Sequence, residues 1–316
     1  MSHLSRRSFL KESAVLTIGA ACGGRRAWSA QSQPRIPLPS AARDRLAVAS
    51  WPFRAFINSP SNQKARKQDA AGMDLKDFGA MVVQRFGVHN IEPLDRHFAS
   101  TEPAYLSELR SATEKAGAHI IDIPVGMRES FYDPDPDQRK KAIEASVRWL
   151  DVAAALGCPS VRLHIARAGD SKPDAGRAAE SLKQVAGHAA AKGIVANLEN
   201  DDNFTEDPFY IVQVLEMVNS PFLRALPDFC NSMLTHDQEF NDRAMRAMFK
   251  LAYNIAHVKD SEVGGKDKLF TVDVAKCFEI AKASGYRGYY SMEWEGAGEP
   301  FAGTQKLVDL TLKYLS

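Results

Sequence analysis

The sequence predicts a fold of the α/β class: a closed (β/α)8 barrel, or TIM barrel, formed by a single domain. Eight short runs rich in β-branched and apolar residues follow one another along the chain, at residues 46–53, 90–94, 119–124, 160–164, 194–199, 223–228, 255–259 and 289–293. Helical patterns fill the gaps between them. Without a leader of about thirty residues, the length is close to the ~250 residues typical of such a barrel, although length alone would also allow two domains of ~150 residues.

The helices between these strands are predicted from apolar stripes and from glycines at their ends. Ile143, Val147, Leu150 and Ala154 recur at the i, i+4, i+7 spacing of a helix that packs on a sheet. No G-x-G-x-x-G sequence follows a strand, which disfavours an open dinucleotide-binding sheet. A glycine stands just before the next strand, where a helix needs a left-handed residue to end, at Gly117, Gly157, Gly193 and Gly285.

Three connections are long, at residues 54–73, 127–137 and 262–270. Each follows a strand, so a barrel places all three over the carboxyl ends of its strands, where active sites lie. We expect them to act as lids over a site.

The N-terminus resembles a twin-arginine export signal. Arg6 and Arg7 stand in the run Ser-Arg-Arg-Ser-Phe-Leu-Lys, and a mildly apolar stretch and small residues follow. We expect residues 1–30 to be a signal peptide cleaved near Ala30, residues 31–316 to form the barrel, and the product to be periplasmic or otherwise exported. A basic amphipathic helix is the alternative, which the glycines at 19, 23 and 24 disfavour. Lipid attachment at Cys22 is not expected, because the leucine usual three residues before such a cysteine is missing.

The composition disfavours several classes of binding partner. The 40 basic and 39 acidic residues are interspersed, so there is no electrostatic footprint for nucleic acid, and a small neutral or weakly charged ligand fits better. No run of ~20 apolar residues is present, so no integral membrane segment is expected. The cysteines at 158, 230 and 277 are odd in number and lack metal-ligand spacing. A homo-oligomer stays an open alternative.

Four consecutive strands end on residues that bind metals: Glu199, Asp228, His257 and Glu293. They are separated by 29 residues (199 to 228), 29 (228 to 257) and 36 (257 to 293), each about one strand–helix unit. A parallel barrel therefore brings all four to one end. Three buried carboxylates repel one another and need a cation or protons. One divalent metal ion resolves the conflict; the oxygen ligands favour Mn²⁺ or Mg²⁺, and Co²⁺ or Zn²⁺ also fits.

The segments around these residues resemble a known family. Residues 196–200, 226–231, 257–260 and 292–295, with 51–53 and 90–92, resemble the sugar phosphate isomerase/epimerase family, which has a xylose isomerase-like TIM barrel. The resemblance extends over essentially the whole chain after the leader. It implies that Glu199, Asp228, His257 and Glu293 are the metal ligands and that Glu199 and Glu293 are also the catalytic groups that pass the proton.

The expected activity is that of a metal-dependent sugar isomerase or epimerase. A metal chelated by a carbonyl oxygen and the neighbouring hydroxyl acidifies the carbon between them and stabilises the enediolate. Two carboxylates on opposite faces of the sugar then epimerise that carbon, and transfer between adjacent carbons gives isomerisation. If a leaving group stands beside the carbanion, the same intermediate expels it. The enzyme would then be a lyase that acts on 3-keto-glycosides by β-elimination. A non-catalytic periplasmic sugar-binding protein is a further alternative, because fold does not prove activity.

Five further residues are candidates for substrate binding. Asn231 stands where the epimerases carry a substrate-binding histidine, so the substrate is expected to differ from theirs. A zinc nuclease with a similar barrel is disfavoured, because Asn231 and residues 266–272 supply none of the histidines it needs. The other candidates share a strand face or strand end with the ligands, or form an aromatic wall: Lys259, His164, Glu295 and Trp51.

Overall fold

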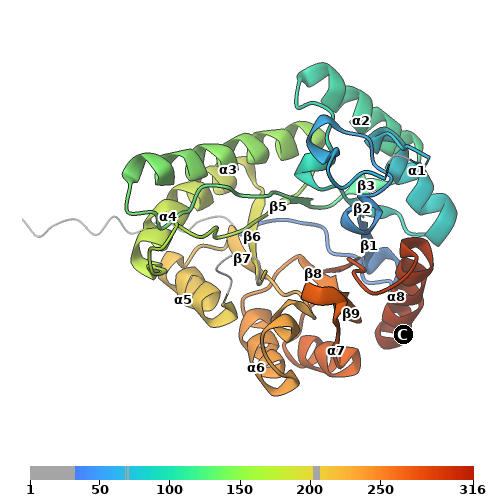
Figure 1. The fold of residues 1–316 in the computed structure, drawn as a ribbon. Helices are drawn as coiled ribbons and strands as arrows, with labels where there is room; N and C mark the ends of the chain where they lie inside the picture. Colours follow the sequence, from blue (N-terminus) through green and yellow to red (C-terminus); the bar gives the residue numbers. More distant parts are fainter. Residues whose placement is uncertain (1–32, 68, 70, 202–206) are drawn as a thin grey trace, which may run out of the picture. The chain divides into compact units, whose positions relative to one another are not determined.

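A computed structural model describes residues 33–316 except 68, 70 and 202–206 (Figure 1). The expected signal peptide and Cys22 lie outside the described residues. No described helix has both the length and the apolar character needed to cross a bilayer.

The strands form a ring of eight parallel positions. The first sheet has the order β3-β2-β1-β11-β8 and the second β4-β5-β6-β7. β3 and β4 are two parts of one barrel position, because β3 pairs with β2 and β4 with β5. The other side is closed between β7 and β8 by the parallel bridges Ala225–Ala252 and Asp228–His257. The barrel strands are β1 (Leu46–Ala49), β2 (Asn90–Glu92), β3 (His119–Ile120), β4 (Ile123–Pro124), β5 (Ser160–Leu163), β6 (Val195–Glu199), β7 (Leu223–Leu226), β8 (Ile255–Val258) and β11 (Tyr289–Met292).

Eight helices surround the described barrel (Figure 1). Aspartate side chains cap the N-termini of most of them; Asp135, for example, accepts a hydrogen bond from the backbone N–H of Asp137. Gly117, Gly157, Gly193 and Gly285 all have positive φ, as predicted for helix ends. The helices are α1 (Leu75–Phe86), α2 (Pro103–Lys115), α3 (Pro136–Leu156), α4 (Ala175–Lys192), α5 (Pro208–Val218), α6 (Gln238–Phe249), α7 (Val274–Ala283) and α8 (Pro300–Leu315).

The fold prediction is confirmed, and most strands lie within two residues of their expected bounds, but the first and the third depart further. The first was expected to continue to residue 53, whereas β1 ends at Ala49 and Trp51–Phe53 form a 3₁₀ turn. Pro52 explains this, because it lacks the N–H that a central strand must donate. The third was expected to be continuous over 119–124, yet it breaks at residues 121–122, where the chain changes partner from β2 to β5.

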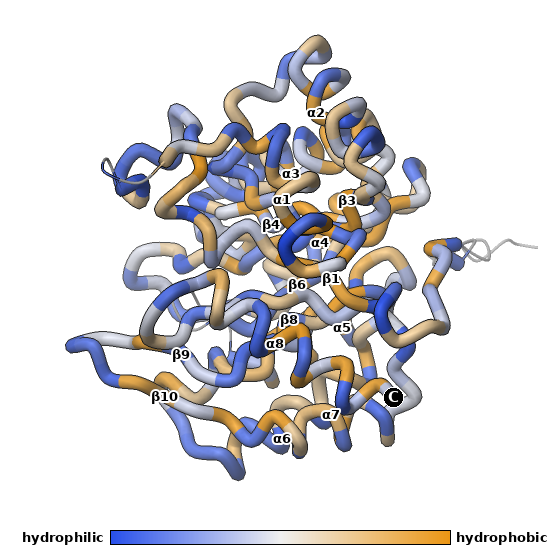
Figure 2. The backbone as a smooth tube through the Cα atoms, turned by 90° about the vertical axis from the view of Figure 1, so that its right-hand side faces the viewer, coloured by the Kyte–Doolittle hydropathy of each residue, from blue (hydrophilic) through white to orange (hydrophobic). Residues whose placement is uncertain are grey.

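The long connections are packed segments rather than open loops. Within 54–73, Asn62 donates hydrogen bonds from its amide to the backbone oxygens of Arg54 and Ile57. Phe131 and Tyr132, in the second connection, are buried. The third contains the hairpin strands β9 (Ser261–Val263) and β10 (Leu269–Thr271), whose connecting residues are hydrophilic in Figure 2.

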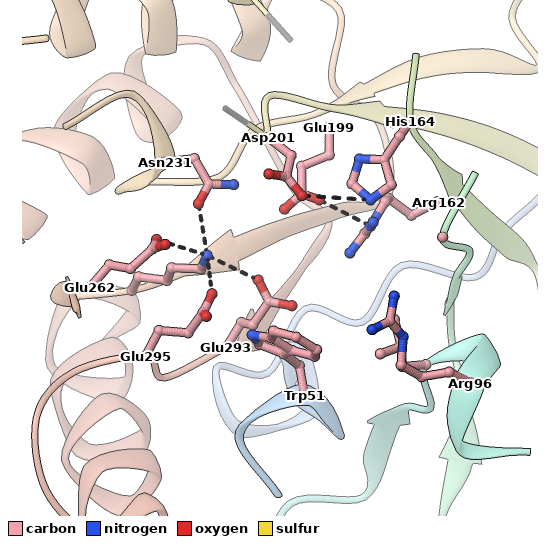
Figure 3. Close-up of a pocket in the computed structure, with 13 residues that line it drawn as sticks. Trp51, Arg96, Arg162, His164, Glu199, Asp201, Asn231, Glu262, Glu293 and Glu295 are labelled. Atoms are coloured by element: carbon pink, nitrogen blue, oxygen red, sulfur yellow. Dashed lines mark hydrogen bonds and ion pairs between the residues drawn. The ribbon is translucent and has the colours of Figure 1, made fainter. Parts of the chain in front are cut away.

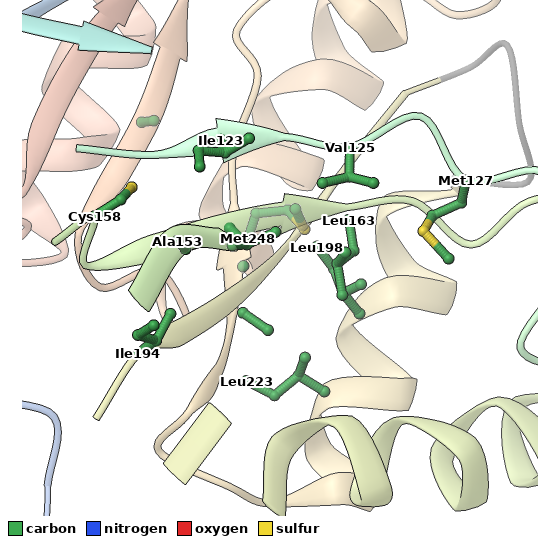
Figure 4. Packing of buried hydrophobic residues seen from close by; sticks show 14 of the residues in the cluster. Ile123, Val125, Met127, Ala153, Cys158, Leu163, Ile194, Leu198, Leu223 and Met248 are labelled. Carbon is green, nitrogen blue, oxygen red and sulfur yellow. The ribbon is translucent and has the colours of Figure 1, made fainter. Parts of the chain in front are cut away.

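Strand alternation separates the apolar core from the polar interior. Val161 and Leu163 of β5 belong to the hydrophobic cluster between strands and helices, whereas Arg162 between them is a buried polar residue. Leu198 of β6 follows the same rule, and Figure 4 shows part of this layer, with Val125, Leu163 and Leu198 extending from neighbouring strands. The residues that alternate with them face the barrel axis, where the polar groups of the site gather.

Candidate metal centre

The four predicted ligands converge at the carboxyl ends of their strands. Glu199 ends β6, Asp228 lies two residues after β7, His257 lies within β8 and Glu293 follows β11. All four are buried, and one ligand atom from each lies within 4.8 Å of the others. The side chains that the sequence placed at matched strand ends therefore share one small volume.

His257 directs its two ring nitrogens to different partners. Nδ1 lies 2.7 Å from Oε1 of Glu199, 3.1 Å from Oε2 of Glu293 and 3.7 Å from Oδ2 of Asp228. Nε2 lies 2.9 Å from Oε1 of Glu92, a fully buried carboxylate that also accepts a hydrogen bond from the hydroxyl of Ser291. One nitrogen thus faces the three carboxylates, while Glu92 fixes the ring from behind.

Glu92 was not among the predicted site residues. A signal was present, because Glu92 belongs to one of the segments that resemble the family; the structure shows that it also ends β2. Because the second strand was expected to run over residues 90–94, Glu92 did not stand at a strand end as the four ligands did, and it was not distinguished from an ordinary strand carboxylate.

Asp228 is held by backbone contacts on one side only. Its Oδ1 accepts hydrogen bonds of 2.8 Å from the backbone N–H groups of Cys230 and Asn231. The amide of Asn200 brackets the Asp228 backbone, accepting from its N–H at 2.8 Å and donating to its carbonyl at 3.2 Å. Oδ2 turns toward the other ligands and has no hydrogen-bond partner among the described residues, although Nζ of Lys259 lies 3.4 Å away.

The charges of the cluster are strongly coupled. Burial would raise the pKa of Glu199, but the charges of Arg162 and His257 outweigh it and hold the pKa below its usual value. Burial, with the charges of Glu199 and Glu293, raises the pKa of Asp228 to about 7. Burial would lower the pKa of His257, but the charges of Glu293, Glu92 and Glu199 outweigh it and raise the pKa well above its ordinary value. Without a cation the cluster therefore retains protons that a divalent ion would replace.

Arg162 and His164 lie on β5 and just after it, beside Glu199. Nε of Arg162 is 3.0 Å from Oε2 of Glu199, and Nε2 of His164 is 3.7 Å from Oδ2 of Asp201. His164, Glu199 and Asp201 also satisfy the distances of a metal site. The guanidinium of Arg162 already supplies a positive charge to Glu199 there.

Lys259 brings together two other predicted residues (Figure 3). Its Nζ donates hydrogen bonds to Oδ1 of Asn231 at 2.8 Å and to Oε1 of Glu295 at 2.6 Å, and it lies 3.3 Å from Oε2 of both Glu262 and Glu293. Burial would lower the pKa of Lys259, but the charges of Asp228, Glu295, Glu293 and Glu262 raise it well above its usual value. Glu262 was not predicted; it comes from the hairpin, whose direction the sequence does not specify.

A pocket opens above this cluster, with a volume of about 140 Å³. Asp228 and His257 are not part of its lining and lie beneath it. Residues 54–73 and 127–137 contribute no described side chain, so of the three expected lids only the hairpin connection reaches the pocket, through Glu262. The predicted residues that line it are Trp51, His164, Glu199, Asn231, Lys259, Glu293 and Glu295, and the unpredicted ones are Leu94, Arg96, Gly126, Arg162, Asp201 and Glu262.

The donor set fits a divalent cation. Three carboxylates and one imidazole nitrogen converge, and Oδ2 of Asp228 has no hydrogen-bond partner among the described residues. A buried carboxylate oxygen left in this state is expected where an ion completes the site. The cluster therefore indicates a divalent-metal site.

Solved structures share the fold at low sequence identity. A xylose isomerase-like TIM barrel protein from Mycobacterium smegmatis, in complex with magnesium, has a TM-score of 0.63 and 18% identity over 85% of this chain and 96% of that one. D-allulose 3-epimerase from Methylomonas sp. has a TM-score of 0.65 and 15% identity, covering 88% and 100%. 3-Keto-D-glucoside 4-epimerase from E. coli has a TM-score of 0.60 and 15% identity, covering 86% and 98%.

Sequence comparison assigns the family. No curated protein matches the chain significantly. A family model described as xylose isomerase-like TIM barrel matches residues 74–314, which is most of the barrel. The chain belongs to the xylose isomerase-like TIM barrel family.

Proposed function

We propose that this protein is a divalent-metal-dependent sugar isomerase or epimerase. The observation that carries the proposal is the placement of Glu199 and Glu293. Both carboxylates line the pocket, and both contact the same nitrogen of His257, at 2.7 and 3.1 Å. A sugar bound beside the ion would therefore lie within reach of two ionised carboxylates, which is what proton removal and return require.

The chain's own groups have complementary roles in this proposal. A bound Mg²⁺ or Mn²⁺, or less favourably Co²⁺ or Zn²⁺, would polarise the sugar carbonyl and stabilise the developing negative charge. Glu199 and Glu293 remove and return the proton. Arg162 keeps Glu199 ionised, and the charges of His257 and Lys259 lower the pKa of Glu293 to about 2, against the effect of burial. We assign Lys259, Asn231, His164, Glu295 and Trp51 to sugar binding, because all five line the same pocket.

A lyase is the second candidate. A similar fold is found in a 3-keto-D-glucoside 4-epimerase, so a 3-keto-glycoside is a reasonable substrate class for the same site. Proton removal beside the keto group would then expel the glycosidic oxygen by β-elimination. The product distinguishes the two: a lyase releases an unsaturated sugar and an alcohol, whereas an epimerase conserves the formula.

Proton exchange tests the proposal directly. Metal-loaded protein is incubated in D₂O with ketoses, aldoses and 3-keto-glycosides, and deuterium incorporation and products are followed by NMR. We expect Glu199→Gln and Glu293→Gln to slow wash-in by roughly 10²–10⁴-fold, and chelation of the ion to abolish it. Glu180→Gln, on the exposed face of α4, is the control and should exchange normally.

Exchange that survives both active-site substitutions would reject the acid–base assignment. Tight sugar binding without any exchange would instead identify a non-catalytic sugar-binding protein.

We also propose export by the twin-arginine route, with residues 1–30 as the signal. The support is the Arg6-Arg7 motif and the apolar stretch after it. Arg6→Lys with Arg7→Lys should leave the protein in the cytoplasm; fractionation that still finds it outside would contradict this route.

A further inference from the structure

Arg96 places a second guanidinium in the pocket, apart from the metal cluster. It belongs to a 3₁₀ turn at residues Asp95–His97, shortly after β2, and lines the pocket together with Trp51 and Gly126. Figure 3 shows its side chain next to Trp51, on the opposite side of that ring from Glu262 and Glu295. A ligand that reaches Glu199 and Glu293 would have this group along its outer part.

Arg96 differs from the other pocket cations in its partners. The Arg162 guanidinium lies 3.0 Å from Glu199, and the ammonium of Lys259 lies within 3.4 Å of four carboxylates. Among the described residues, by contrast, no carboxylate lies within ion-pair distance of the Arg96 guanidinium, and the guanidinium donates no hydrogen bond. Its positive charge therefore remains available to a ligand in the pocket.

The surroundings of Arg96 hold the turn and leave room for the side chain. The backbone N–H of Arg96 donates to Oδ1 of Asp95 at 2.6 Å, and its carbonyl accepts a hydrogen bond from the hydroxyl of Ser59. The guanidinium carbon lies 5.7 Å from the centre of the Trp51 ring. A Cβ at position 126 would lie 3.2 Å from Nη2, so glycine there provides the space. The nearby Asp95 carboxylate is occupied by backbone N–H groups, including that of Gly126 at 3.0 Å.

We propose that Arg96 forms a subsite for an oxyanion on the substrate, so that the preferred sugar carries a carboxylate or a phosphate. This proposal rests on the proposed function only in taking the pocket as the sugar site. A guanidinium binds either oxyanion through two parallel hydrogen bonds, which are stronger than those to a neutral hydroxyl. The metal cluster would hold the reacting carbons while Arg96 selects the charged end.

Calorimetric binding to the magnesium-loaded protein tests the subsite without turnover. The probes are D-glucose, D-glucuronate and D-glucose 6-phosphate. At least one anionic probe should bind roughly tenfold to a hundredfold more tightly than glucose. Arg96→Gln should abolish that preference, and Arg96→Lys should keep only part of it. Whichever anion shows the Arg96-dependent preference identifies the oxyanion.

Arg54→Gln is the matched control. The Arg54 guanidinium also stacks on Trp51, at 4.2 Å from the ring, but Arg54 does not line the pocket. This variant should therefore keep the preference for the anionic probe. Equal binding of all probes, no binding of either anion at tens of millimolar, or a preference that survives Arg96→Gln would each overturn the subsite.

The two proposals fail in different ways. Deuterium wash-in into neutral sugars without Arg96-dependent binding would leave the isomerase assignment intact and remove the subsite. Arg96-dependent binding without deuterium wash-in would support the subsite and reject the isomerase assignment.

Discussion

At the residue scale, the arrangement around His257 assigns separate tasks to its two ring nitrogens. Nδ1 faces Glu199, Asp228 and Glu293, whereas Nε2 lies 2.9 Å from Glu92. A carboxylate behind a ligating imidazole fixes the tautomer and raises its basicity, so that the lone pair faces the ion. Glu92 is thus a positioning residue.

Glu92→Gln should weaken metal binding by about 10–100-fold, as the loss of such outer partners typically does. Titration of the metal-free protein with Mn²⁺ measures this. Glu102→Gln, at the exposed start of α2, provides the control. Unchanged affinity in Glu92→Gln would show that the ring is held by its other contacts alone.

The sequence predicted the four residues that recur at strand ends most directly, and it missed Arg96, whose place depends on contacts distant in the sequence. Glu199, Asp228, His257 and Glu293 were identifiable because consecutive parallel strands must end together. Arg96 lies in a short turn after β2, and its side-chain direction depends on Trp51 and Gly126. Those neighbours lie in segments that follow other strands, β1 and β4, so no local pattern specifies the contact.

At the element scale, α8 approaches the metal centre through a glycine. Gly303 is buried in α8, and a Cβ there would lie 2.2 Å from an indole carbon of Trp294, the residue after Glu293. Helix α8 therefore supports the Glu293 strand end by direct packing that only glycine permits.

A glycine-to-alanine substitution should have opposite effects on stability in α8 and in α4. Gly303→Ala should destabilise the protein by about 1–3 kcal/mol through overpacking and should slow proton exchange by displacing Trp294. Gly187→Ala in α4 meets nothing within 4 Å and should stabilise by about 0.5–1 kcal/mol. Urea unfolding measures both; destabilisation of equal size would refute the packing explanation.

The elements themselves were largely predictable from periodicity and helix-end glycines. The failures were local: Pro52 ended β1 early, and the third strand broke where it changed partner. A partner change depends on the closure of the whole barrel and leaves no mark in the hydrophobic pattern.

At the scale of the whole molecule, a buried histidine links stability to pH. His97 is fully buried, with Nδ1 2.7 Å from the hydroxyl of Ser50, and burial together with the charges of Arg96 and Arg54 lowers its pKa to about 3. The unfolded chain, with an ordinary histidine pKa near 6.5, binds the proton more readily. The contribution of His97 to the free energy of unfolding is therefore fully present above about pH 6.5, and it is lost as the pH decreases toward 3.

His97→Gln removes this titration. Between pH 6 and 4 the free energy of unfolding of the variant should fall less steeply, by up to about 1.4 kcal/mol per pH unit. Urea denaturation across that range checks the slope; parallel curves for the two proteins would mean that His97 does not contribute.

The closure of the barrel between β7 and β8 gives the ion a mechanical role. Few backbone hydrogen bonds cross this seam, including those from the amides of His257 to Pro227 at 3.0 Å and of Phe229 to His257 at 3.3 Å. Asp228 and His257 stand on its two sides, so an ion held by both would clamp the seam shut.

Amide hydrogen exchange at residues 229 and 257 should slow when Mg²⁺ is added and recover on chelation, while the amides between β5 and β6 stay unchanged. Equal exchange rates with and without Mg²⁺ would contradict the clamp. Slower exchange with Mg²⁺ would show that the ion proposed to support the reaction also prevents the barrel from opening at this seam.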